Sequence, residues 1–322
     1  MTYPSNFQPA WWLKNRHLQT MAGKLFRKNL QLNIINETIE LPDGDFVDLA
    51  WTEDANLNKD KPIVYVLHGL EGSIDSHYAK GMMHAIQQRG WIGLLMHFRG
   101  CSGKPNRYGP SYHSGDTFDI HYCVDFLKPR FANRPLGIMG FSLGGNVLAN
   151  YLAEDEHHPF ASAAIICAPL HLSSCSSRIG QGFSKVYQKY LVDMLKNSTQ
   201  QKINLGLIKH IDKNELAGIR KLADFDEKVT APIHGFQNAE DYYQQVSGLY
   251  KLDKVTTPTL IIHALDDPFL CHEFVTQIPD NPKLTVELSP YGGHVGFIAG
   301  KNPLKPEFYL DQRVLDYLSE QW

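Results

Sequence analysis

Residues 140–144 read Gly-Phe-Ser-Leu-Gly, so Ser142 stands between two glycines. An apolar run at residues 136–139 precedes this segment and a helical pattern follows it, which places the serine on a turn between a strand and a helix. Such a sharp turn strains the serine backbone and leaves no room for side chains at Gly140 and Gly144. We interpret Ser142 as a nucleophile that attacks a carbonyl carbon, the alternative being a serine that only caps the helix.

A serine hydroxyl needs a neighbouring base before it becomes a good nucleophile. On a strand-turn-helix scaffold the acid and then the histidine follow the serine along the chain. The chain has 15 histidines, and we choose His294 because glycines flank it in a loop after the strand-like residues 284–288. His294 would accept the proton of Ser142 and later return it to the leaving group. The alternative is a structural loop histidine.

Two carboxylates compete for the role of the acid. Asp266 and Asp267 both follow the apolar run at residues 259–263. We prefer Asp267, because the residue before a proline is held in an extended turn conformation. Asp266 is the alternative, and both could be ordinary turn residues. The acid would fix the tautomer of His294 and stabilise its charged form.

The negative oxygen of a tetrahedral intermediate needs N–H donors aimed at it. The backbone N–H of Leu143, directly after the nucleophile, is the first candidate. The second is the backbone N–H of Leu70, in the loop at residues 68–73 that follows the apolar run at residues 62–67. A plain turn is the alternative reading of that loop. We predict an oxyanion hole built from these two main-chain groups.

The elements around these residues alternate between strands and helices. Beyond two N-terminal strands at residues 30–41 and 46–51, the pattern predicts strands at residues 62–67, 91–96, 136–139, 161–167, 259–263 and 284–288, and helices at residues 76–88, 115–128, 144–154 and 311–319, with Pro129 ending the second helix. This alternation predicts an α/β protein with a mostly parallel central sheet and helices on both faces.

Residues 171–250 break the alternation with helical patterns and no convincing strand. We interpret them as a helical cap insertion over the sheet, the alternative being an extension of the scaffold. The predicted organisation is an N-terminal arm at residues 1–29, a core at residues 30–170, the cap at residues 171–250 and the rest of the core at residues 251–322.

Composition and the absence of several motifs exclude some classes of function. The 322 residues are 43% hydrophobic and 20% charged with a net charge of −3, which argues against a nucleic-acid partner. There is no zinc-ligand spacing, phosphate-binding loop or dinucleotide motif, so we predict no metal and no cofactor. Five unpatterned cysteines and a start without signal-peptide features lead us to expect a cytoplasmic protein.

The N-terminal arm mixes apolar and basic side chains at residues 11–28. A basic amphipathic segment can make weak peripheral contact with an anionic membrane. We favour the alternative, an arm packed on the domain with its basic face in solvent.

The sequence resembles the YheT-like branch of the α/β-hydrolases. This branch includes bacterial proteins described as esterases and animal abhydrolase-domain proteins. The resemblance covers nearly the whole chain and lies in residues 7–12, 17–20, 68–73, 97–103, 112–117, 140–146 and 266–269. It implies an α/β-hydrolase fold and a triad of Ser142, Asp267 and His294.

The resemblance also implies a serine hydrolase that cleaves carboxylic esters, with a small-molecule ester or lipid as its substrate. An acyltransferase that uses the same acyl-enzyme is one alternative, although the His-x-x-x-x-Asp motif associated with it does not occur here. A non-catalytic scaffold that binds a lipid or a partner is the other.

Overall fold

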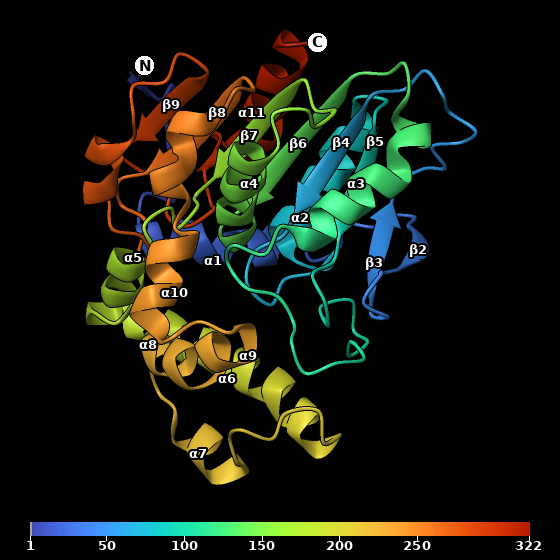
Figure 1. The fold of residues 1–322 in the computed structure, drawn as a ribbon. Coiled ribbons are helices and arrows are strands. Elements are labelled where there is room, and N and C mark those ends of the chain that lie inside the picture. Colours follow the sequence, from blue (N-terminus) through green and yellow to red (C-terminus); the bar gives the residue numbers. More distant parts are fainter. Residues whose placement is uncertain (1) are drawn as a thin grey trace.

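The computed structural model describes residues 2–322, and a nine-stranded sheet runs through its centre (Figure 1). The strand order is β1-β9-β8-β7-β6-β4-β5-β3-β2. In this order, each neighbouring pair from β1 at one edge across to β5 is parallel. The last two pairs, β5 with β3 and β3 with β2, are antiparallel. The predicted mostly parallel sheet is therefore confirmed. The strands are β1 (Thr2–Pro4), β2 (Ile35–Glu40), β3 (Phe46–Trp51), β4 (Ile63–Leu67), β5 (Ile92–Met96), β6 (Leu136–Phe141), β7 (Ser162–Ile166), β8 (Thr259–Ala264) and β9 (Leu284–Ser289).

The five strands from β4 to β8 are buried along their whole length. Continuous apolar sequence suits these strands because helices cover both of their faces. The register pairs Leu67 at the end of β4 with Gly140 near the end of β6. The loop after β4 and the turn after β6 therefore leave the sheet side by side, which brings residues 68–73 next to Ser142.

Helices cover the sheet on both faces (Figure 1). Helices α2 (His77–Gln88) and α11 (Tyr309–Glu320) lie together and are joined by an ion pair between Arg89 and Asp316. Helices α3 (Phe118–Phe131) and α4 (Leu143–Glu154) lie side by side in front of the sheet, where the rings of His121 and Tyr151 are 4.7 Å apart.

The predicted end of α3 at Pro129 is wrong, because the helix continues to Phe131 with Pro129 inside it. A proline in a helix removes one hydrogen bond and crowds the carbonyl four residues earlier. Here Leu127 and Phe131 on either side of Pro129 are both buried against the core. Their burial holds the last turn in helical form despite the proline.

Residues 171–250, which we call the cap, are helical and gather beyond one end of the sheet (Figure 1). The cap has its own apolar cluster, which includes Val192, Ile208 and Phe225. Its helices are α5 (Leu172–Ile179), α6 (Lys185–Asn204), α7 (Lys213–Gly218), α8 (Leu222–Phe225), α9 (Ala231–His234) and α10 (Ala239–Val246), with a π-helical turn at Asp226–Thr230 between α8 and α9.

The N-terminal residues form two elements that the sequence pattern did not reveal. Strand β1 adds to the sheet edge beside β9, and helix α1 (Arg16–Phe26) follows it. Two short strands near the C-terminus, β10 (Ile298–Ala299) and β11 (Glu307–Phe308), form a separate ribbon. Within residues 2–322, no helix combines the length and the apolar character that crossing a bilayer requires.

Candidate active site

Ser142 occupies the turn that joins β6 to α4, and its backbone has φ 51° and ψ −121°. A positive φ is strained for a residue with a side chain and persists only where the surroundings impose it. The surroundings are tight here. A Cβ atom on Gly140 would lie 2.3 Å from the carbonyl oxygen of Gly144, and one on Gly144 would lie 2.4 Å from that of His68. Both predicted elbow glycines therefore stand where only a hydrogen fits.

We expect Gly144→Ala to destabilise the protein by about 3 kcal/mol, because the new methyl group would press on main-chain carbonyls that cannot rotate away. Gly218→Ala is the matched control, since a Cβ atom there meets nothing within 4 Å. Denaturant unfolding of both variants measures the difference. Equal unfolding midpoints for the two variants would contradict the steric account of the elbow.

The three predicted triad side chains form one hydrogen-bonded row. Nε2 of His294 lies 3.0 Å from Oγ of Ser142, and Nδ1 of His294 lies 2.8 Å from Oδ2 of Asp267. Asp267 is buried and His294 is largely buried. With Nδ1–H donating to the carboxylate, Nε2 is left to accept the proton of the serine hydroxyl. This arrangement can deliver an alkoxide-like oxygen to an electrophilic carbon.

The structure separates the two candidate acids. The second carboxylate oxygen of Asp267, Oδ1, accepts the N–H of Phe269 at 2.8 Å, and the Phe269 ring stacks on the His294 ring at 4.1 Å and 5°. Among the described residues no hydrogen bond or ion pair joins Asp266 to the imidazole, and Oδ1 of Asp266 accepts the N–H of Gly293 at 2.9 Å. Asp267 thus orients the ring of His294, whereas Asp266 holds the loop that carries it.

Helix α1 also supports the histidine loop, which sequence reasoning missed. Oγ1 of Thr20 accepts the backbone N–H of His294 at 2.9 Å. Gln19 is fully buried, and its side chain bonds the N–H and the carbonyl of Ile298 at 2.7 and 2.9 Å. A signal was present in the sequence, because residues 17–20 belong to the segments that carry the family resemblance. Helix α1 therefore packs on the domain and reaches the site.

The two predicted oxyanion donors are both main-chain N–H groups. Within residues 2–322, neither the N–H of Leu70 nor that of Leu143 donates a hydrogen bond to the protein. Leu143 is the first residue of α4, where the helix dipole adds positive potential. A Cβ atom on Gly69 would lie 3.2 Å from Cβ of Ser142, which places the loop before Leu70 directly against the nucleophile.

A large pocket opens on Ser142 and His294 and extends between the core and the cap, enclosing about 1130 Å³ of empty space including its mouth. The cap contributes a mainly apolar wall, formed by Leu172, Ile179, Leu191, Leu195, Ile208, Leu222, Phe225, Val229 and Ile233. Such a wall suits a hydrocarbon chain, because burying each methylene group is favourable by about 0.8 kcal/mol.

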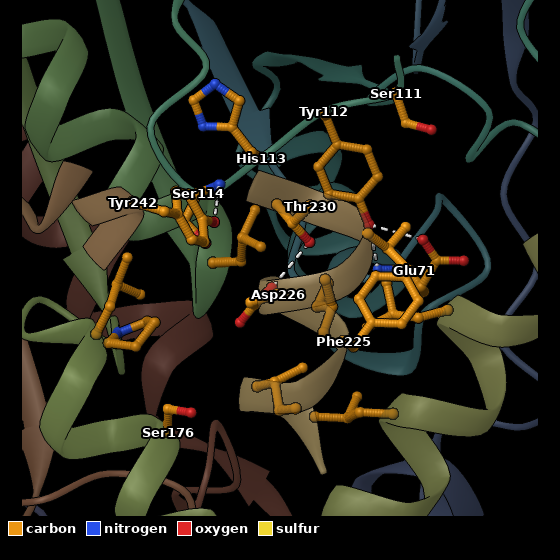
Figure 2. A pocket seen from close by; sticks show the side chains of 18 of the residues that line it. Glu71, Ser111, Tyr112, His113, Ser114, Ser176, Phe225, Asp226, Thr230 and Tyr242 are labelled. Carbon is orange, nitrogen blue, oxygen red and sulfur yellow. Dashed lines mark hydrogen bonds between the residues drawn. The ribbon is translucent and has the colours of Figure 1, made fainter. Parts of the chain in front are cut away.

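A buried carboxyl group interrupts the apolar wall (Figure 2). Asp226 lies in the π-helical turn and accepts hydrogen bonds from the hydroxyls of Tyr243 at 2.7 Å and Thr230 at 2.9 Å. No cation forms an ion pair with it among the described residues. Burial therefore dominates and raises the pKa of Asp226 from 3.8 to about 6.

This raised pKa predicts a pH-dependent cost to stability. Because the folded-state pKa exceeds the unfolded value, the favourable contribution is complete below the unfolded pKa and is lost as pH rises through about 6. We expect Asp226→Asn, which cannot ionise, to gain roughly 1.5 kcal/mol relative to the natural protein between about pH 5 and about pH 7.5.

Denaturant unfolding across this pH range measures the gain. Asp224→Asn, at an exposed position of the preceding helix α8, is the control and should show no such trend. A constant difference between Asp226→Asn and the natural protein would show that Asp226 titrates normally.

No group of three or more His, Cys, Asp or Glu side chains within residues 2–322 is arranged to hold a metal ion.

Comparison with known proteins agrees with this architecture. The alpha/beta hydrolase fold family matches residues 62–301. An Escherichia coli (strain K12) protein named "Putative esterase YheT" is 43% identical over 98% of this chain and 93% of its own length. The Saccharomyces cerevisiae "Monoacylglycerol lipase" is 31% identical over 78% of this chain and 58% of its own. The human "Phospholipase ABHD3" is 24% identical over 95% of this chain and 76% of its own.

A solved structure has the same fold. The esterase Pf2001 of Pyrococcus furiosus superposes with a TM-score of 0.60 at 17% identity, over 91% of this chain and 93% of the esterase. The 43% identity to the YheT protein over 98% of this chain confirms the resemblance of the sequence to the YheT-like branch. The chain belongs to the alpha/beta hydrolase fold family, among relatives of the esterase and lipase type.

Proposed function

We propose that the protein is a serine hydrolase that cleaves carboxylic esters through an acyl-enzyme on Ser142. The observation that carries the proposal is the hydrogen-bonded row from Ser142 through His294 to Asp267, set in the wall of a pocket beside two unpaired N–H groups. A scaffold that only binds a ligand has no need of this combination. The names of the YheT and lipase relatives support the same class of reaction.

The proposed reaction uses the serine, the histidine and the two N–H groups in turn. Ser142 Oγ attacks the ester carbonyl carbon while His294 Nε2 takes the hydroxyl proton, and the carbonyl oxygen becomes an anion held by the N–H groups of Leu70 and Leu143. The carbon–oxygen bond to the alcohol breaks as His294 returns the proton to the alcohol. Water then attacks the acyl-enzyme with His294 again as the base, and the carboxylic acid leaves with Ser142 restored.

The apolar wall of the cap leads us to propose acyl esters as substrates, with the acyl chain lying along the cap. An activity screen over p-nitrophenyl esters of graded chain length tests this proposal. We expect kcat/KM to rise at least about tenfold from the acetyl to the octanoyl ester, because methylene groups become buried. Ser142→Ala should lower hydrolysis by at least about 10⁴-fold. A purified natural protein that cleaves none of the esters would contradict the proposal.

A further inference from the structure

Hydrogen bonds fix the loop that carries Leu70 on both sides of the Leu70 N–H group, one of the two proposed oxyanion donors. The N–H of Gly69 donates to the hydroxyl of Tyr78 at 2.8 Å, and the N–H of Glu71 donates to the hydroxyl of Tyr112 at 2.7 Å. Only the N–H of Leu70, between them, has no partner among the described residues. Two tyrosine hydroxyls thus bracket one free donor.

The backbone of Glu71 adopts a strained conformation that its neighbours hold in place. Its φ of 49° lies in the left-handed region, which is strained for a residue with a side chain. Tyr112 contacts it twice, because its hydroxyl accepts the Glu71 N–H and also donates to Oε1 of the Glu71 carboxylate at 2.9 Å (Figure 2). The second carboxylate oxygen, Oε2, accepts a hydrogen bond from Ser198 on cap helix α6.

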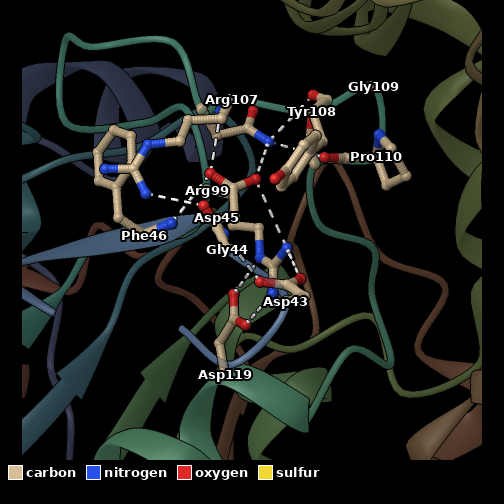
Figure 3. A network of polar contacts seen from close by, with 12 residues as sticks. Asp43, Gly44, Asp45, Phe46, Arg99, Arg107, Tyr108, Gly109, Pro110 and Asp119 are labelled. Carbon is tan, nitrogen blue, oxygen red and sulfur yellow. Dashed lines mark hydrogen bonds and ion pairs between the residues drawn. The ribbon is translucent and has the colours of Figure 1, made fainter. Parts of the chain in front are cut away.

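Tyr112 is itself held in place. Its ring stacks on Phe98 with centroids 5.0 Å apart and planes 13° apart. The segment before it is anchored by Asn106, whose amide donates to Oδ2 of Asp45 at 2.7 Å and to the carbonyl of Pro110 at 2.8 Å. Asp45 belongs to the polar network around Arg99, shown in Figure 3. This polar network therefore anchors the segment that leads to Tyr112.

We propose that Tyr112 is a positioning residue of the oxyanion hole, and that with Glu71 and Ser198 it links the placement of the Leu70 N–H to the cap. The inference rests on the proposed function, because it assumes that the Leu70 N–H binds the anionic oxygen. Tyr112 acts through the main chain of Glu71. It holds the free N–H beside Ser142 before substrate arrives, so no reorganisation is needed when charge develops.

Tyr112→Phe tests the inference, because it removes the hydroxyl and keeps the ring that stacks on Phe98. We expect kcat on a p-nitrophenyl ester to fall about 10- to 100-fold with KM within about threefold of the natural value, since the loss concerns the transition state. A trifluoromethyl ketone, whose adduct with Ser142 places an oxyanion in the hole, should bind more weakly by a similar factor. Ser198→Ala, which cuts only the link to the cap, should lower kcat by a few-fold.

Tyr190→Phe is the matched control, because Tyr190 is exposed on α6 and its hydroxyl has no role in the site. Should Tyr112→Phe fold poorly, Glu71→Gly removes the carboxylate contacts instead, and glycine adopts a positive φ without strain. Because the Tyr112 hydroxyl can still accept the N–H of residue 71, kcat and ketone affinity should fall together by a smaller factor, about three- to tenfold. Natural values of both for Tyr112→Phe, or for Glu71→Gly in its place, would overturn the inference.

Labelling separates this inference from the proposed function. A fluorophosphonate should modify Ser142 in the natural protein and, more slowly, in Tyr112→Phe. If the natural protein neither hydrolyses esters nor becomes labelled, the proposed function fails. If it does both and Tyr112→Phe matches it in kcat and in ketone affinity, only the positioning role fails.

Discussion

Ser142→Ala is expected to lower kcat/KM for ester hydrolysis by about 10⁴- to 10⁶-fold. The alanine side chain leaves His294 and both backbone N–H donors in place but offers no oxygen to attack the carbonyl carbon. The residual rate would come from substrate binding and from stabilisation of the oxyanion during attack by water. Initial rates on the best p-nitrophenyl ester, measured at high enzyme concentration, give the ratio.

The control for this variant is Ser319→Ala. Ser319 lies on α11, and among the described residues its hydroxyl donates to the carbonyl of Asp316 in the same helix and to no other group. It should hydrolyse the ester at the natural rate and unfold normally. A loss of less than about tenfold in Ser142→Ala, in protein of natural stability, would mean that another group performs the chemistry.

Asp267→Asn is expected to lower kcat by about 10⁴-fold, although the substitution changes almost no volume. The carboxylate can only accept from Nδ1–H of His294, whereas an asparagine amide turned toward the ring can donate to Nδ1. The ring would then carry its proton on Nε2, which is the nitrogen that must accept the proton of Ser142. The base would be disabled while the site kept its shape.

The neighbouring aspartate provides a matched comparison. In Asp266→Asn the side-chain oxygen can still accept the N–H of Gly293, so the histidine loop keeps its support. We expect a loss of kcat below about tenfold for this variant. Equal losses in the two variants, or a larger loss in Asp266→Asn, would show that the acid has been assigned to the wrong carboxylate.

The nucleophile was predictable from the sequence because its signal is local. The glycines at 140 and 144, the strand before them and the helix after them are contiguous, and the steric demand that selects glycine acts within five residues. Asp267 and His294 lie far from Ser142 in the chain, but each follows a predicted strand, and the order serine, acid, histidine along the chain guided the choice. The structure brings all three together.

The supporting residues were not predictable in the same way. Thr20 and Tyr112 act by binding main-chain groups 274 and 41 residues away, and no periodicity or spacing encodes such contacts. Strand β1 spans only three residues, too few for an alternating pattern to show. The end of α3 was predicted wrongly, because proline usually ends a helix but here the burial of the residues around Pro129 keeps the helix going.

The shape of the pocket under the cap was not predictable from the sequence either. The helical character of the cap followed from amphipathic patterns, but the shape of the pocket depends on how the helices pack against each other and against the core. Asp226 illustrates this, because a charged residue in a sequence window normally indicates a solvent-exposed face. Only the fold places it in an apolar wall, with Tyr243 and Thr230 as its partners. Packing between distant segments decides such positions.

Every step of the proposed reaction passes through a covalent bond to Ser142. Peptide mapping by mass spectrometry after treatment with a fluorophosphonate shows whether Ser142 forms such a bond. We expect one phosphonate group per chain, attached to the peptide that contains residues 140–144 and located on Ser142. Labelling should be blocked by prior incubation with an ester substrate analogue. An adduct on any other residue, or continued ester hydrolysis by protein whose Ser142 is fully modified, would contradict the account.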